Sequence, residues 1–277
     1  MPQFKQVDVF TTEKFKGNPV AVFFDSEHLT DKEKGQISAW TNLSEATFIE
    51  PATKPEADYK VRIFSMEHEL PFAGHPTIGT CHALLEAGII KPKNGKVVQE
   101  CGAGLVSLEV TDTTPPIFRF KLPYAKRRDL TRQEIAKVTE VLGVSDAIDA
   151  AVYDVGPVWL TILLDSAETV LQLDPQEVRL IEVSKDLQVS GIQVIGRYSD
   201  HKYETRTFAP LVGVKEDPVC GSGSGATAAF LRDSQKITGT TELSQGAALN
   251  RAGKITIEGG DEIFVSGSAV TVIEGHY

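Results

Sequence analysis

The sequence is poor in several features, and each shortage argues against a class of protein. Its three cysteines, Cys81, Cys101 and Cys220, form no C-x-x-C pair, which speaks against a disulfide framework or a zinc knuckle. Its longest apolar stretch, Ala151 to Leu164, is interrupted by Asp154 and is too short to cross a bilayer. The N-terminal segment has no apolar core, so it does not resemble a signal peptide.

Positive charge is also scarce. The 277 residues include 28 Lys+Arg and 38 Asp+Glu, for a net charge of -10, and the one basic run, Lys126 to Arg128, is short. Nucleic-acid-binding proteins need clustered basic side chains on one face, so no nucleic-acid partner is expected. Hydrophobic residues make up 41% and charged residues 24%, as in an ordinary globular protein. We therefore expect a cytoplasmic protein with no membrane partner and one large or two smaller domains.

The chain contains an internal repeat. The segment GNPVAVFFDS near the N-terminus returns as GPVWLTILLDS, Arg62-x-Phe64 returns as Arg206-x-Phe208, and AGLVSLE returns as AGKITIE. These matches keep their order with an offset of about 138 to 149 residues, which indicates two copies of one unit. We place the first half at residues 1–125 and a linker helix with the second half at 126–277. The linker helix is predicted from the capping-box pattern Thr131-x-x-Glu134 and from Gly143.

Within each half the pattern is mostly strand with two helices. Short β-branched and aromatic runs such as YKVRIFS and VWLTILL alternate and end at turn residues, which is typical of antiparallel sheets. An outer helix is expected near Thr30 in one half and at Asp174-Pro175 in the other. The second helix of each half (Pro76 to Ala87 and Ser224 to Leu231) lacks a polar face and must be enclosed. The predicted fold is α+β, with two similar antiparallel β-rich halves, each a curled sheet or open barrel around a central helix.

Both central helices begin at glycine-led turns. These are Gly74-His75-Pro76-Thr77 in the first half and Gly221-Ser222-Gly223-Ser224-Gly225 in the second half. The first turn of a helix exposes unpaired N–H groups and the positive end of the helix dipole, which favours an anion. Two such helix starts facing one cleft between the halves would suit a small carboxylate-bearing substrate. We take Gly74, Gly221, Ser222, Gly223 and Ser224 as candidate substrate-binding residues, although turn and packing roles alone would also explain these glycines.

Other kinds of site fit the sequence poorly. The glycine-rich GSGSGA does not have the G-x-G-x-x-G spacing of dinucleotide-binding loops, and no Gly-Lys-Ser/Thr motif is present for a phosphate loop. His75 and His82 would lie too far apart on one helix to share a metal ion, and Pro71 and Pro76 separate them from His68. We expect His82 to be a core or interface residue and His68 a surface one. Neither a metal nor a cofactor is predicted.

The two halves differ in their titratable residues. Glu45 aligns with Gly191, His75 aligns with Ser222, and Asp217 has no acidic counterpart. Glu45 opens an apolar strand, where partial burial would suit a carboxylate for proton transfer, although a solvated strand-end carboxylate is the plainer interpretation. A duplicated scaffold with unduplicated acid–base groups would give a single asymmetric active site. Cys220, at the start of the second central helix, is a candidate auxiliary thiol or only a small packing residue.

Four segments together are similar to the signature blocks of the PhzF-like phenazine-biosynthesis family. They are GNPVAVF, NLSEATFI, ELPFAGHPTIGT and KEDPVCGSGSG, and they follow the family's order through nearly the whole chain. The resemblance implies the diaminopimelate-epimerase fold and a cofactor-free isomerisation that moves a proton between ring carbons. It implies that Glu45 shuttles the proton, that His75 assists as acid or hydrogen-bond partner, and that Asp217 holds the substrate's polar groups.

The sequence departs from this family at Val219-Cys220-Gly221, where the family commonly has Ala-Thr-Gly. The cysteine makes this segment similar to epimerases and racemases that use one cysteine from each half, but the first-half position is Ala73. We therefore expect a cofactor-independent isomerase acting on a small carboxylated metabolite, without naming the substrate. Two alternative functions stay open, an epimerase that uses Cys220 and a non-catalytic metabolite-binding protein. A homodimer is a possible assembly.

Overall fold

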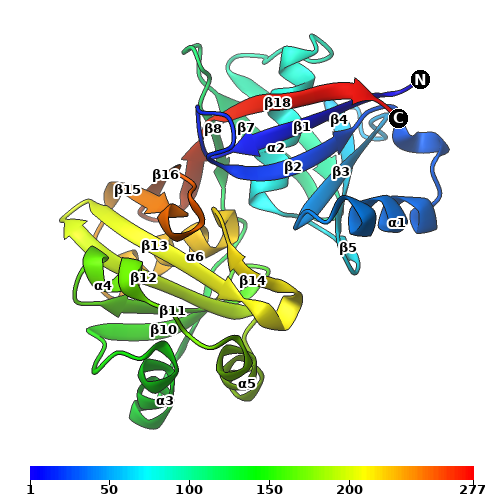
Figure 1. Cartoon of the computed structure of the whole chain (residues 1–277). Helices are drawn as coiled ribbons and strands as arrows, with labels where there is room; N and C mark the ends of the chain where they lie inside the picture. Colours follow the sequence, from blue (N-terminus) through cyan, green and yellow to red (C-terminus); the bar gives the residue numbers. More distant parts are fainter. The chain divides into compact units, whose positions relative to one another are not determined.

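The structure is a computed structural model that describes residues 1–277, and its chain divides into two compact units. Unit 1 comprises residues 1–121 and 266–277, and unit 2 comprises residues 122–265. The sequence-based boundary at 125/126 lies close to the first crossing between the units. The last strand of the chain, however, belongs to unit 1, where it lies beside the first strand (Figure 1).

Unit 1 is a curved, mixed sheet with two helices. Its strands are β1 (Gln3–Val9), β2 (Asn18–Phe23), β3 (Glu45–Glu50), β4 (Tyr59–Ser65), β5 (Glu69–Leu70), β6 (Lys96–Cys101), β7 (Gly104–Val110), β8 (Phe118–Lys121) and β18 (Ala269–His276). They follow the spatial order β18–β1–β2–β3–β4–β6–β7–β8, and β5 pairs with β4. Helix α1 (Asp31–Thr41) packs on β3 and β4, and helix α2 (Gly74–Glu86) packs on β1, β2 and β18.

Unit 2 repeats this arrangement and adds two helices. Its strands are β9 (Lys126–Asp129), β10 (Asp149–Asp154), β11 (Val158–Leu164), β12 (Gly191–Ser199), β13 (Lys202–Ala209), β14 (Val214–Asp217), β15 (Gly239–Gln245), β16 (Gly253–Gly259) and β17 (Phe264–Gly267), the last of which crosses the unit boundary. The spatial order is β9–β10–β11–β12–β13–β15–β16, and β14 pairs with β13. The helices are α3 (Arg132–Leu142), α4 (Ala167–Gln172), α5 (Glu177–Leu187) and α6 (Gly221–Asp233).

The two sheets have the same series of pairings. From β18 in unit 1 and from β9 in unit 2, successive neighbours are antiparallel, antiparallel, parallel, antiparallel, parallel and antiparallel. The predicted α+β fold of two similar β-rich halves is therefore confirmed. Each sheet is mostly antiparallel but contains two parallel pairs, because helical connections join strands that run in the same direction. In unit 1 these connections contain α1 and α2, and in unit 2 they contain α5 and α6.

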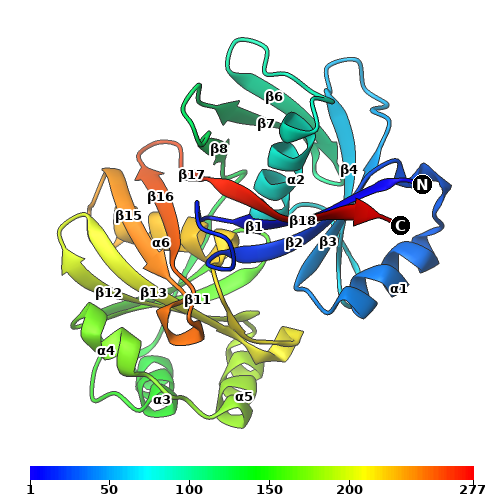
Figure 2. The ribbon, with the colours of Figure 1, turned by 45° about the horizontal axis from the view of Figure 1, so that its top comes forward.

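The central helices are enclosed as the sequence predicts. In α2 ten residues are buried, including His75, and in α6 the segment from Gly223 to Leu231 is buried throughout. Figure 2 shows α2 against the strands of unit 1 and α6 within the strands of unit 2. Close packing requires a glycine at position 79, because a Cβ there would lie 2.4 Å from a methyl group of Val20. No helix of the structure is long and apolar enough to span a bilayer.

Helix boundaries follow the capping residues in α1 and α3 but not in α5. Thr131 and Glu134 form the expected capping box, and Gly143 ends α3 with a φ of 74°. The prediction that an outer helix begins at Asp174-Pro175 is wrong, because α5 begins at Glu177. The preceding segment is extended, and the carbonyl of Leu173 accepts a hydrogen bond from the Arg206 guanidinium at 2.5 Å. The first backbone hydrogen bond of α5 runs from the Leu180 N–H to the Gln176 carbonyl at 3.1 Å, so Gln176 and not Asp174 is the N-cap residue.

Candidate active site

Glu45 and His75 form a pair inside unit 1. Glu45 is the first residue of β3, and His75 is the second residue of α2. His75 Nδ1 lies 3.4 Å from Glu45 Oε2, and the two side chains are 5% and 19% exposed, respectively. The strand and the helix thus bring together two titratable groups that are 30 positions apart in the sequence.

Two buried polar atoms of this pair, Glu45 Oε2 and His75 Nε2, make no hydrogen bond within the protein. The same is true of Ser44 Oγ, on the residue before Glu45. Buried polar groups in folded proteins are nearly always hydrogen-bonded, because an unmade hydrogen bond costs on the order of 1–3 kcal/mol. A carboxylate oxygen and an imidazole nitrogen of one buried pair that make no hydrogen bond indicate a site that hydrogen-bonds a ligand.

The histidine of the pair is shifted towards its neutral form. Burial lowers the pKa of His75, although the Glu45 carboxylate and a hydrogen bond to the Pro19 backbone oppose that shift. A neutral imidazole can donate at one nitrogen and accept at the other. His75 can therefore assist a proton transfer at neutral pH.

The start of α2 leaves its first-turn N–H groups uncapped. Its N-cap residue, Ala73, makes no side-chain hydrogen bond to the helix. Gly74 is required here, since a Cβ at this position would lie 2.6 Å from the ring of Phe120. The packing therefore explains the glycine, and the uncapped N–H groups can bind an anion beside His75.

The remaining candidates gather at the start of α6 in unit 2. Cys220 is the N-cap residue, and its Sγ accepts a hydrogen bond from the Gly223 N–H at 3.3 Å. The Asp217 carboxylate accepts one from the Val219 N–H at 3.0 Å. Ser224 is fully buried and donates to the Cys220 carbonyl at 2.7 Å, so its hydroxyl already has a structural partner. Ser222 is only partly buried.

A buried glutamine holds the segment that carries these residues. The Gln245 side chain donates to the Asp217 carbonyl at 2.8 Å and accepts from the Cys220 N–H at 3.1 Å. Its amide thus fixes both ends of the turn before α6. The sequence gives no local sign of this role, because the contact joins positions 25 or more residues apart.

Two arginine–glutamate pairs fix the strands that lead into the central helices. Arg62 makes two hydrogen bonds to Glu69 on β5, at 2.8 and 2.6 Å, and Arg206 makes two to Glu216 on β14, both at 2.8 Å. Each glutamate stands five residues before the first residue of α2 or α6. The repeated Arg-x-Phe motif signals the duplication, but its role in positioning these segments becomes clear only in the structure.

The structure thus groups the predicted residues within the units. Glu45, His75 and Gly74 lie together in unit 1, whereas Asp217, Cys220 and the Gly221–Ser224 segment lie together in unit 2. Their joint action on one substrate stays a prediction. His68 is exposed and His82 is partly buried, with its Nε2 3.1 Å from Thr271 Oγ1.

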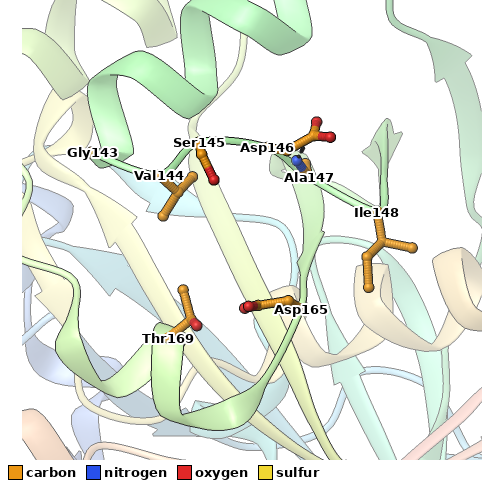
Figure 3. Close-up of a pocket in the computed structure, with 8 residues that line it drawn as sticks. All are labelled: Gly143, Val144, Ser145, Asp146, Ala147, Ile148, Asp165 and Thr169. Carbon is orange, nitrogen blue, oxygen red and sulfur yellow. Dashed lines mark hydrogen bonds between the residues drawn. The ribbon is translucent and has the colours of Figure 1, made fainter.

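A surface pocket in unit 2 includes none of these residues. It has a volume of about 480 Å³ and lies between the segment after α3 and the start of α4 (Figure 3). Its two carboxylates, Asp146 and Asp165, belong to exposed residues. Because the pocket has no buried polar atom without a partner, we place the candidate active site at the Glu45–His75 pair instead.

Comparisons with known proteins support the fold and the isomerase class. The family profile described as "Phenazine biosynthesis-like protein" (PhzC-PhzF) matches residues 7–275. The chain is 43% identical to "Antisense-enhancing sequence 1" of Schizosaccharomyces pombe, with 98% of this chain and 97% of the relative covered. It is 31% identical to "Trans-2,3-dihydro-3-hydroxyanthranilate isomerase" of Pseudomonas aeruginosa, with 99% of both covered.

Solved structures show the same fold. A Bacillus anthracis PhzF-family protein superposes with a TM-score of 0.86 at 21% identity, covering 99% of this chain and 98% of the other. A probable proline racemase from Agrobacterium radiobacter superposes with a TM-score of 0.69 at 16% identity, covering 100% and 93%. The chain belongs to the phenazine biosynthesis-like (PhzC-PhzF) family.

Proposed function

We propose that this protein is a cofactor-independent isomerase that moves a proton between two carbons of a small carboxylated metabolite. The observation that carries the proposal is the Glu45–His75 pair, whose buried Oε2 and Nε2 atoms make no hydrogen bond within the protein. Its relatives include the Pseudomonas aeruginosa "Trans-2,3-dihydro-3-hydroxyanthranilate isomerase". From this relative we carry over to our protein only the class of substrate, which is a carboxylated ring that bears amino or hydroxyl groups.

In the proposed reaction Glu45 is the base. Its carboxylate accepts a proton from one substrate carbon, and the electron pair left behind shifts along the conjugated system. The carboxyl group of Glu45, whose proton exchanges with solvent, then delivers a proton to another carbon. His75 hydrogen-bonds the reacting group or Glu45 during the transfer. We further propose that the starts of α2 and α6 hold the substrate's negative charge and that Asp217 binds its amino or hydroxyl group.

Two further properties belong to this proposal. We propose that residues from both units act on one substrate molecule, since the acid–base pair occurs only in unit 1 and Asp217 only in unit 2. We also propose that the protein acts in the cytoplasm, a location consistent with its three free thiols.

The test is hydrogen exchange at carbon. Incubated in D₂O with trans-2,3-dihydro-3-hydroxyanthranilate and related carboxylated rings, the wild-type protein should incorporate deuterium at a substrate carbon, which NMR detects. Glu45→Gln should slow this at least about a hundredfold, because general-base catalysis contributes that much or more. Glu67→Gln, at an exposed glutamate, is the matched control and should exchange like wild type. An unchanged rate in Glu45→Gln would refute the assignment of the base.

A second candidate function is epimerisation with Cys220 as one of two acid–base groups. It is favoured by the position of the thiol at the α6 start, 3.3 Å from the Gly223 N–H. Cys220→Ala separates the two functions. The carboxylate mechanism predicts that this variant retains most of its exchange activity, whereas a thiol mechanism predicts that the activity is lost.

A further inference from the structure

At the position of Glu45 and at the neighbouring position on the adjacent strand, the two units carry side chains of opposite relative size. The parallel register pairs Ala21 with Ala46 in unit 1 and Leu160 with Ile192 in unit 2. One residue earlier on these strands, Val20 and Glu45 therefore correspond to Trp159 and Gly191. Unit 1 has a small residue beside a carboxylate, and unit 2 has a large ring beside a glycine.

The packing around Gly191, by backbone as well as by the Trp159 ring, leaves no room for a second Glu45-like side chain. A Cβ at position 191 would lie 2.8 Å from the Trp159 ring and 2.3 Å from the Phe208 carbonyl oxygen. Trp159 is 4% exposed, so its ring is part of the packed interior. Unit 2 therefore cannot carry its own carboxylate base at this position.

The indole N–H has a specific partner. Trp159 Nε1 donates a hydrogen bond to Ser222 Oγ at 3.1 Å, and Ser222 corresponds to His75 at the second position of its helix. A buried indole N–H needs an acceptor, and it can only donate. The Ser222 oxygen must therefore be the acceptor in this contact, which leaves the hydroxyl proton for another group.

Within the protein, the Ser222 hydroxyl also contacts a sulfur atom, which is a weak acceptor for that proton. Cys220 Sγ lies 3.6 Å from Ser222 Oγ and already accepts the Gly223 N–H. A carboxylate or carbonyl oxygen is a stronger acceptor than a thiol sulfur. The same helix start favours negative charge through its N–H groups and dipole.

We propose that Trp159 is a positioning residue that fixes Ser222 as a hydrogen-bond donor to an oxygen of the substrate. This inference rests on the proposed function, in which the start of α6 binds the negative charge of a carboxylated substrate. Trp159 itself does not contact the reacting atoms. Its effect is on the direction of the Ser222 hydroxyl.

The first experiment observes the contact without substrate. The chain has two tryptophans, Trp159 and the exposed Trp40, so its ¹⁵N–¹H spectrum contains two indole signals, which Trp40→Phe assigns. Ser222→Ala should shift the Trp159 signal and leave that of Trp40 in place. If the Trp159 signal does not move, the proposal is wrong whatever the protein's substrate.

The second experiment measures binding and turnover. Trp159→Phe keeps an aromatic ring but removes the N–H, and Trp40→Phe is the matched control. In a Glu45→Gln background, which holds the substrate without converting it, Trp159→Phe should weaken binding of trans-2,3-dihydro-3-hydroxyanthranilate roughly tenfold, the value of about one hydrogen bond. With Glu45 intact, it should raise KM by a similar factor and change kcat by less than about threefold.

A double-variant comparison separates positioning from general packing. In a Ser222→Ala background, Trp159→Phe should cause no further loss of affinity, because the hydroxyl through which it acts is gone. Additive losses would show that Trp159 acts only through packing and would overturn the proposal. Absence of deuterium exchange in wild type would instead refute the proposed function, while the indole signals would still decide the Trp159–Ser222 contact.

Discussion

At the residue scale, buried ionisable groups behave differently according to their partners. His75 lies beside the Glu45 carboxylate, whose charge raises its pKa against the stronger lowering by burial. Removing that charge should therefore move the His75 titration midpoint further down. We expect Glu45→Gln to lower the midpoint measured by NMR of the ring nitrogens, with Glu67→Gln unchanged. A rise in the midpoint would contradict the geometry of the pair.

Glu204 is a buried carboxylate outside the candidate site. It is 2% exposed, its Oε1 has no hydrogen-bond partner, and Tyr198 donates to its Oε2 at 3.0 Å. Burial raises its pKa from 4.5 to about 7. The folded protein thus binds this proton more tightly than the unfolded chain, and ionisation destabilises the fold. The loss of folding stability caused by this ionisation is absent below pH 4.5. It grows as the pH rises towards about 7 and is complete above pH 7.

Glu204→Gln is neutral at every pH and should remove that dependence. We expect the variant to gain on the order of 1–3 kcal/mol relative to wild type between pH 5 and pH 8. Urea unfolding at pH 5 and pH 8 measures this gain in unfolding free energy. Glu242→Gln, at an exposed position on β15, is the control. An equal difference between variant and wild type at both pH values would show that Glu204 does not titrate in this range.

At the scale of elements, the duplicated arginine–glutamate pairs should differ in energetic weight because they differ in burial. The Arg206–Glu216 side chains are 7% and 10% exposed, and Arg206 also donates to the Leu173 carbonyl. The Arg62–Glu69 side chains are 20% and 40% exposed. Lysine cannot reproduce the two parallel hydrogen bonds of either arginine.

Arg206→Lys should therefore cost about 3 kcal/mol of unfolding free energy and Arg62→Lys about 1 kcal/mol or less. Chemical denaturation measures the unfolding free energy of each variant relative to the same wild-type protein. Equal costs would mean that burial does not set the strength of these pairs. The more exposed pair serves as the control for the general effect of an arginine-to-lysine change.

Helices and strands also differ in how far the sequence predicts them. Strands, capped helices and the internal repeat were predictable because their signals are local or periodic. The acid–base candidates were predictable because Glu45 and His75 break the symmetry of that repeat. The start of α5 was not predictable, because its N-cap residue, Gln176, makes no side-chain capping hydrogen bond and has no local signal. The role of Trp159 was not predictable either, because it depends on the pairing of Trp159 with Gly191 on the neighbouring strand.

At the scale of the whole molecule, the C-terminal residues complete unit 1. Strand β18 pairs with β1, and the Tyr277 ring packs edge-on against Phe23 with centroids 5.0 Å apart. The Tyr277 hydroxyl donates to the Phe24 carbonyl at 2.7 Å. We expect Tyr277→Ala to cost about 2–3 kcal/mol and Tyr277→Phe, which loses only the hydroxyl, about 1 kcal/mol by thermal or urea unfolding. Similar costs for both would mean that the ring contributes little.

The pairing of β1 with β18 also has a consequence for biosynthesis. All of unit 2 is contiguous, whereas unit 1 needs a strand that follows unit 2 along the chain. On the ribosome, the later-encoded unit can finish folding while the earlier one still waits with an open edge at β1. That edge can pair with other chains, so the nascent protein is most exposed to aggregation just before its final segment emerges.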